Sequence, residues 1–202
     1  SRTNGSSYNY NNEFAAVGFF GRVNYDYKGK YLLEANVRYD GSSMFPEGKK
    51  FGLFPSFSAG WRASEEAFMN WAKPAMSDLK IRGSWGTIGN QDVAANTFIS
   101  TMASGTSGWV VNGVNLLRLS APTVTSASLT WEKVTTLDLG FDARFFNGDF
   151  GVTFDWYQRV TSDMHTAGVT LPATFGASVP KINYGEVTAT DWQLALDYSH
   201  SF

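Results

Sequence analysis

Apolar and polar residues alternate through much of the chain, and this alternation predicts β-strands with two different faces. Between Tyr31 and Asp40 the odd positions are almost all apolar or aromatic, and the even positions from Glu34 onwards are polar or charged. A period of two places successive side chains on opposite faces of a strand. The same pattern predicts about seven strands, near residues 14–27, 31–40, 54–63, 79–87, 134–146, 150–160 and 190–199.

The connections between these strands are of two kinds. The sequences KGK at 28–30 and NGD at 147–149 predict tight hairpin turns, because glycine adopts positive φ readily. The connections 41–53, 88–133 and 161–189 are long and rich in Gly, Ser, Thr, Asn and Pro. Segment 64–78 predicts one short helix near 65–72 at the short-turn end, with Ser64 as its N-cap and Pro74 ending it.

Two environments explain such strands, namely a soluble β-sandwich and a membrane β-barrel. The apolar face of each predicted strand is nearly free of charge, as hydrocarbon requires, since a charge at the midplane costs about 2–4 kcal/mol. Aromatic residues crowd the strand ends of that face, as in the girdles of membrane barrels. We therefore predict that lipid contacts the side bearing Leu33, Val37, Leu139 and Val152.

About seven strands do not make a complete membrane barrel, because every backbone polar group in lipid must be paired and the sheet must close. The polar face also carries many arginines, which fit a bore wider than that of a small barrel. The chain is therefore expected to be all-β, a part of a larger antiparallel transmembrane barrel. A soluble β-sandwich that binds carbohydrate and a small complete outer-membrane barrel acting as an adhesin or enzyme remain alternatives.

The polar face supplies the candidate functional residues, which would line the wet interior of the barrel. Cross-strand ion pairing and hydration are their simplest role. In the long connection 88–133, Trp109 could contact a ligand or a partner protein, although burial of its ring against another loop is the expected role. The candidates that face the lumen are Glu34, Asn36, Arg38, Asp40, Arg62, Arg82, Asp138, Asp142, Arg144, Asp155 and Arg159.

Composition argues against several other functions. The formal net charge of −2 offers no basic surface for nucleic acid. There are no cysteines, and the two histidines, His165 and His200, have no partner at metal-ligand spacing. No run approaches 18 apolar residues, so no transmembrane helix is expected. We expect no catalytic residues, no metal and no cofactor, and therefore no enzyme.

Four stretches closely resemble the SusC/RagA family of TonB-dependent outer-membrane transporters of Bacteroidetes. The most specific is GKYLLEANVRYDGSSMFPEGKKFGLFPSFSAGWRASEEAFM at 29–69, which SDLKIRGSWGTIGNQ follows at 77–91. The stretches TWEKVTTLDLGFDARFFNGDFGVTFDWYQRVTSDM and LPATFGASVPKINYGEVTATDWQLALDYSHSF, at 130–164 and 171–202, resemble later parts of the same barrel. The resemblance covers nearly the whole chain.

This resemblance implies a barrel of roughly 22 strands with an N-terminal plug domain inside it. It also implies import of glycans or peptides, energised through a TonB complex, and a SusD-like lipoprotein on the outer face. The location would be the outer membrane of a Gram-negative bacterium. Residues 1–202 show neither a plug nor a TonB box, so they are expected to form part of the barrel domain only.

Overall fold

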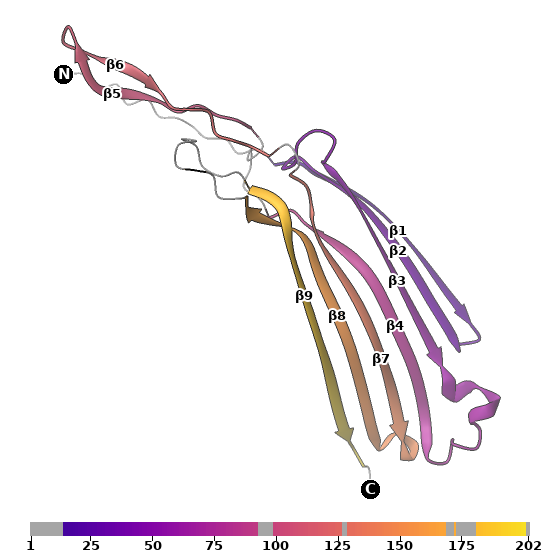
Figure 1. Cartoon of the computed structure of the whole chain (residues 1–202). Helices are drawn as coiled ribbons and strands as arrows, with labels where there is room; N and C mark the ends of the chain where they lie inside the picture. Colours follow the sequence, from indigo (N-terminus) through magenta and orange to yellow (C-terminus); the bar gives the residue numbers. More distant parts are fainter. Residues whose placement is uncertain (1–13, 93–98, 127–128, 169–171, 173–180, 201–202) are drawn as a thin grey trace.

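Seven long strands form a single antiparallel sheet, as Figure 1 shows. The computed structural model describes residues 14–92, 99–126, 129–168, 172 and 181–200. Spatial order follows chain order, and each strand pairs with the next one along the sheet. The strands are β1 Ala16–Tyr27, β2 Tyr31–Ser42, β3 Phe51–Arg62, β4 Met76–Asn90, β7 Glu132–Phe145, β8 Phe150–Ala167 and β9 Lys181–Tyr198.

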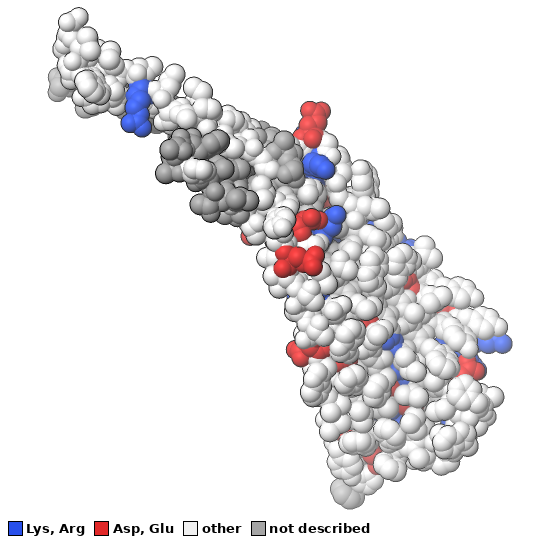
Figure 2. Space-filling view, in the orientation of Figure 1, with Lys and Arg blue, Asp and Glu red and all other residues white. Residues whose placement is uncertain are grey.

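The sheet is one layer thick, and its apolar face is uncovered. Leu33 and Leu139 on that face are 51% and 49% exposed, and Val37 is 43% exposed. Within the described residues, no second sheet packs against these side chains, so the structure gives no support to a β-sandwich. Figure 2 shows broad uncharged areas on one side of the molecule, with only scattered charged side chains.

The two tight turns lie at the same end of the sheet, as predicted. Lys28 and Gly29 have φ values of 56° and 66°, and Tyr27 pairs with Tyr31 across the turn. In the second turn, residues 146–148 all have positive φ, and Phe145 pairs with Phe150. Two of the three turn residues at 146–148 are not glycine, so the backbone strain there is held by the strands on either side.

The predicted short helix near 65–72 is wrong. The structure has two separate 3-10 turns there, η1 Ala63–Glu65 and η2 Ala67–Met69, and the N-cap position of η1 is Arg62 rather than Ser64. Side-chain contacts explain the break. Ser64 is buried and its hydroxyl donates to Asp78, while Glu66, extended between the two turns, accepts from Tyr31 of β2. These tertiary contacts outweigh the helical tendency of the segment.

Strand structure extends further into the long connections than the alternation predicts. A second two-stranded sheet lies within 88–133 and consists of β5 Ser104–Val111 and β6 Val114–Leu119. Likewise β8 and β9 continue to Ala167 and back from Lys181, past a register shift at Thr161 and Met164. Asp163, inside this bulge, has a φ of 57°. The bulge interrupts the period of two, which is why the alternation stops there.

A small buried core lies at the long-loop end, away from the tight turns. It contains Phe45, Phe54, Leu129 and Trp131, none more than 5% exposed. The rings of Phe45 and Phe54 lie 5.0 and 5.4 Å from that of Trp131, whose indole nitrogen donates to the carbonyl of Lys50 at 3.1 Å. Side chains at Gly52 or Gly89 would clash with the Phe54 ring. The core joins the 43–50 loop to the start of β7.

Candidate functional site

The polar residues of successive strands lie side by side on one face of the sheet. Asn36 is opposite Arg22 in β1 and Ser56 in β3, and Asp142 is opposite Lys80 in β4 and Thr153 in β8. Because directly paired residues share a face, the register places all the predicted polar positions on the same side. We call this side the polar face.

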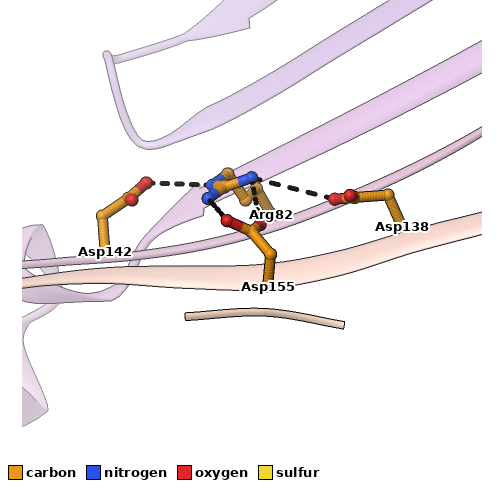
Figure 3. A network of polar contacts seen from close by, with 4 residues as sticks. All are labelled: Arg82, Asp138, Asp142 and Asp155. Atoms are coloured by element: carbon orange, nitrogen blue, oxygen red, sulfur yellow. Dashed lines mark hydrogen bonds and ion pairs between the residues drawn. The ribbon is translucent and has the colours of Figure 1, made fainter. Parts of the chain in front are cut away.

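Arg82 of β4 is the centre of the largest charged network on the polar face (Figure 3). Its guanidinium contacts both carboxylate oxygens of Asp155, at 2.6 and 2.8 Å, and donates through Nε to Asp142 at 3.1 Å. Asp138 lies 3.8 Å from Nη1. We call these four residues the Arg82 cluster. The contact of Nη2 with Oδ2 of Asp155 is a charge-assisted hydrogen bond, and the others are ion-pair contacts or a second such bond to Asp142. The cluster therefore ties β4, β7 and β8 together.

A glycine makes the central contact of the cluster possible. Arg82 and Asp155 belong to strands that do not touch, and Gly140 of β7 lies between them, paired with both. A Cβ atom at Gly140 would clash with the Asp155 carboxylate and would lie 3.1 Å from Cζ of Arg82. The missing side chain therefore leaves the space in which the two charges meet.

The arrangement recurs one strand further along the sheet. Arg144 of β7 forms an ion pair with Asp197 of β9, and Gly151 of β8 lies between them, paired with both. A Cβ at Gly151 would clash with Asp197 and would approach Nη1 of Arg144 to 2.6 Å. Both units follow the chain order arginine strand, glycine strand, aspartate strand. Sequence reasoning placed the charges on the polar face but missed the glycines between them.

The other predicted residues of the polar face are placed as follows. Glu34 lies 3.8 Å from Arg22, whose Nε donates to Asn36 at 2.6 Å. Arg38 and Asp40, neighbours on the polar side of β2, form a 3.0 Å pair. Arg62 lies 3.7 Å from Asp78 near the short-turn end, and Arg159 is paired in register with Thr136 and Ala189. The structure brings Arg82, Asp138, Asp142 and Asp155 into one cluster. The other predicted residues lie outside it, in smaller groups or, for Arg159, at a register position beside uncharged residues.

A hollow lies in the sheet toward the long-loop end. Its volume is about 510 Å³, and its lining includes Glu34, Arg38, Asp40 and Ser56, together with Phe54 of the buried core. Charged and hydroxyl groups beside aromatic side chains are suited to a polar organic ligand or to ordered water. The hollow extends over β4 and reaches Thr136 of β7, so it shares two strands with the Arg82 cluster.

Asn183 of β9 holds the start of β7 in place from the far side of β8. Its amide nitrogen donates to the carbonyl oxygens of Thr130 and Asp163, at 2.9 and 2.7 Å, and its oxygen accepts from the Thr130 nitrogen at 3.1 Å. His165 also contacts the Thr130 carbonyl, at 2.9 Å. These contacts give His165 a structural role beside the bulge rather than a chemical one.

The β5–β6 hairpin projects beyond the long-loop end of the sheet as an arm (Figure 1). Asn112 and Gly113 form its tip with φ values of 51° and 78°. Trp109 is 78% exposed, and Val114 and Leu117 are 65% and 73% exposed. Arg118 is the only charged residue between 99 and 126, and the arm in Figure 2 is correspondingly almost uncharged. The Asn-Gly pair is the signal from which the hairpin could have been predicted.

A polar cluster joins η1 and η2 to the β1–β2 turn at the opposite end. The hydroxyl of Tyr31 donates to Glu66 at 2.7 Å, and Lys30 lies 3.4 Å from the same carboxylate. The bond from Tyr31 holds the pKa of Glu66 below its usual range. The cluster fixes the turn segment against the end of β2.

The described residues contain no group of three His, Cys, Asp or Glu side chains placed to hold a metal ion. His200 contacts the carboxylate of Asp149 at 2.6 Å, beside the second tight turn. None of the helices in the described part is long and apolar enough to cross a membrane. The chemistry that the polar face offers is ion pairing and hydrogen bonding to a solvated ligand.

Comparison with known proteins identifies similar sequences. The family described as "TonB dependent receptor-like, beta-barrel" matches residues 1–199. TonB-dependent receptor P26 of Formosa agariphila is 33% identical over 184 residues, which are 91% of this chain and 18% of that protein. TonB-dependent receptor SusC of Bacteroides thetaiotaomicron is 35% identical over 156 residues, which are 73% of this chain and 15% of that protein.

Comparison with solved structures gives the same picture of the fold. A structure of the RagAB peptide transporter superposes with a TM-score of 0.76 at 26% identity, over 91% of this chain and 20% of the matched chain. The chain therefore spans about a fifth or less of the proteins that it resembles. These relatives carry names of receptors and transporters rather than of enzymes.

Proposed function

Because this chain belongs to the TonB-dependent receptor β-barrel family, we propose that it forms part of the barrel of an outer-membrane nutrient importer. Barrels of this family lie in the outer membrane of Gram-negative bacteria. The observation that carries the proposal is the two-faced single sheet, whose apolar side is bare and whose polar side is linked by charge networks. Contact with lipid explains the bare apolar side, and a lumen filled with water or solvated substrate explains the charged polar side.

Residues 1–202 supply one section of the barrel wall, and the remaining strands, the plug and the TonB contact belong to other parts of the whole protein. On this proposal the polar residues from Glu34 to Arg159 line the lumen. The charged pairs hold the wall rigid and hydrated, and the hollow beside Arg38 and Ser56 is open to passing substrate. The wall itself performs no chemical step.

We propose that the substrate is an oligosaccharide or a peptide. The RagAB structure, titled a peptide transporter, supports the peptide class. The oligosaccharide class follows from the resemblance to the SusC/RagA family. The hollow carries both signs of charge together with Ser56 and Phe54, which fits hydroxyl-rich and amide-rich ligands alike.

A SusD-like lipoprotein on the outer face is the proposed partner of the β5–β6 arm. A two-stranded hairpin with little packing of its own is marginally stable in water. Trp109, Val114 and Leu117 are also too exposed and too apolar to be explained as ordinary surface. A flat protein surface would cover such side chains better than a sugar, which needs hydroxyl and amide partners as well as a ring.

The test is deletion of the gene for the whole protein in its host, followed by uptake of labelled oligosaccharide and peptide pools. We expect uptake of one pool to be lost and to return with the intact gene. Dissipation of the proton gradient should give the same loss in the wild type, since TonB coupling consumes that energy. Unchanged uptake of both pools, with no binding of either by the purified protein, would contradict the proposal.

A further inference from the structure

Three glycines of the polar face have the same neighbour on the following strand. Gly18, Gly140 and Gly151 are paired in register with Asp40, Asp155 and Asp197, respectively. In each case Oδ1 of the aspartate leans over the glycine into the space that a side chain would fill. At Gly18 a Cβ would lie 2.6 Å from that oxygen.

In two of these units the carboxylate leans toward an arginine on the strand before the glycine. Arg82 is paired in register with Gly140, and Arg144 is paired with Gly151. Each arginine reaches across its glycine to the aspartate two strands away. A complete unit therefore has an arginine, a glycine and an aspartate on three successive strands. The unit at Gly18 has the glycine and the aspartate, Asp40, but no described strand that could carry the arginine.

The incomplete unit lies at the open edge of the sheet. β1 is the edge strand, and the described residues place no strand beyond it. Arg38 contacts Oδ2 of Asp40 at 3.0 Å, while Oδ1, the oxygen over Gly18, accepts no bond from any described residue. The side chain of Asp40 is only 20% exposed. A carboxylate oxygen is thus directed at the place where the next strand must lie.

We infer that the strand pairing with the free edge of β1 carries an arginine or lysine opposite Gly18, and that this cation binds Asp40. The occupant is another strand of the same barrel, because an unpaired edge in lipid leaves backbone groups without partners. The matched relatives are long enough to supply it, since this chain covers 18% and 15% of two of them. Charge complementarity then sets the register.

This inference rests on the barrel family and not on the import proposal. Its tests measure register and stability without any uptake assay, so either can fail while the other stands.

Cysteine cross-linking in the whole protein locates the residue opposite Gly18. Residues 1–202 contain no native cysteine to interfere. Gly18→Cys is combined with single cysteines at successive positions of the neighbouring strand, and disulfide formation is read on a gel. Arg22→Cys, on the same face of β1, gives the same register if Gly18→Cys does not fold. We expect an arginine or lysine at the position that cross-links; a neutral or acidic residue there overturns the inference.

A double-mutant cycle tests the contact itself. The basic residue is changed to Gln and Asp40 to Asn, singly and together, in an Arg38→Gln background that removes the local partner. We expect each single change to lower the unfolding temperature and the double change to lower it no further. Arg144→Gln with Asp197→Asn is the matched positive control. Additive lowering at Asp40, with coupling at the control pair, rejects the contact.

Discussion

The guanidinium of Arg82 and the carboxylate of Asp155 meet at 2.6 and 2.8 Å, although a whole strand separates their backbones. The contact exists because Gly140 has no side chain. We therefore expect Gly140→Val to force the two groups apart and to lower the free energy of unfolding by about 1–3 kcal/mol. The measurement is denaturant unfolding of the whole protein in detergent. Gly105→Val, at a position with open space around it, is the control and should change stability by about 0.5 kcal/mol or less.

Opposite faces of the sheet should respond differently to the same added charge. Leu139→Lys places an ammonium group on the apolar face and should destabilise the folded barrel by about 2–4 kcal/mol. Ser84→Lys is the matched control, since Ser84 lies one strand away on the polar face, paired with Asp138. We expect its effect to be about 0.5 kcal/mol or less. Equal losses from the two variants in lipid vesicles would show that hydrocarbon does not contact Leu139.

The contact between Tyr31 and Glu66 predicts a dependence of stability on pH. The pKa of Glu66 is lowered in the folded state, so its contribution is complete above the ordinary value of about 4.3 and is lost as the pH falls through the lowered value. Glu66→Gln should therefore cost stability at pH 7, and the difference from wild type should shrink on acidification. Glu65→Gln, at the exposed neighbouring position, is the control. A difference that stays constant down to pH 3 would contradict this account.

The buried core at the long-loop end depends on Phe54, which is 4% exposed and fits over Gly52 and Gly89. Phe54→Ala should lower the free energy of unfolding by about 3–5 kcal/mol, the usual range for a buried aromatic ring. Phe20→Ala is the control, because Phe20 is 86% exposed. Thermal unfolding in detergent measures both. Similar small losses would mean that the core does not hold the 43–50 loop.

The arm is the proposed contact of a SusD-like lipoprotein, and the proposal can be tested at Trp109. Trp109→Ala should weaken association of the two purified proteins about tenfold or more, as expected for an aromatic residue at the centre of an interface. Trp71→Ala is the matched control, since Trp71 is 82% exposed at the opposite end of the sheet. Binding can be measured by titration in detergent. Unchanged affinity for Trp109→Ala would move the contact to another loop.

Much of the sheet follows from local sequence, because a strand between two solvents must alternate. The faces of β2, β4, β7 and β8 were predictable for that reason, and so was the placement of the charged residues. The pairing of Arg82 with Asp155 was not, because it depends on the register between β4 and β7, and the connection between these strands is the long segment 91–131. Gly140 carries no periodic signal of its own.

The parts that were missed have physical reasons as well. The prediction of a helix at 65–72 assumed that Ser64 caps it and that Glu66 lies in its first turn. In the structure, Ser64 donates to Asp78 of β4 and Glu66 accepts from Tyr31 of β2. The arm is exposed on both sides, so it has no alternation, although Asn112 and Gly113 mark its turn. Most of the added length of β8 and β9 lies beyond a bulge, which interrupts the period of two.

The glycine-bridged ion pairs also penalise errors in strand pairing. A shift of one residue in β8 would turn Asp155 to the other side of the sheet, because successive side chains alternate. Arg82 would lose its best acceptor, and a carboxylate would enter hydrocarbon. The ion pair therefore forms only when three successive strands are correctly aligned. A slip of one strand both removes the ion pair and places a charge in hydrocarbon.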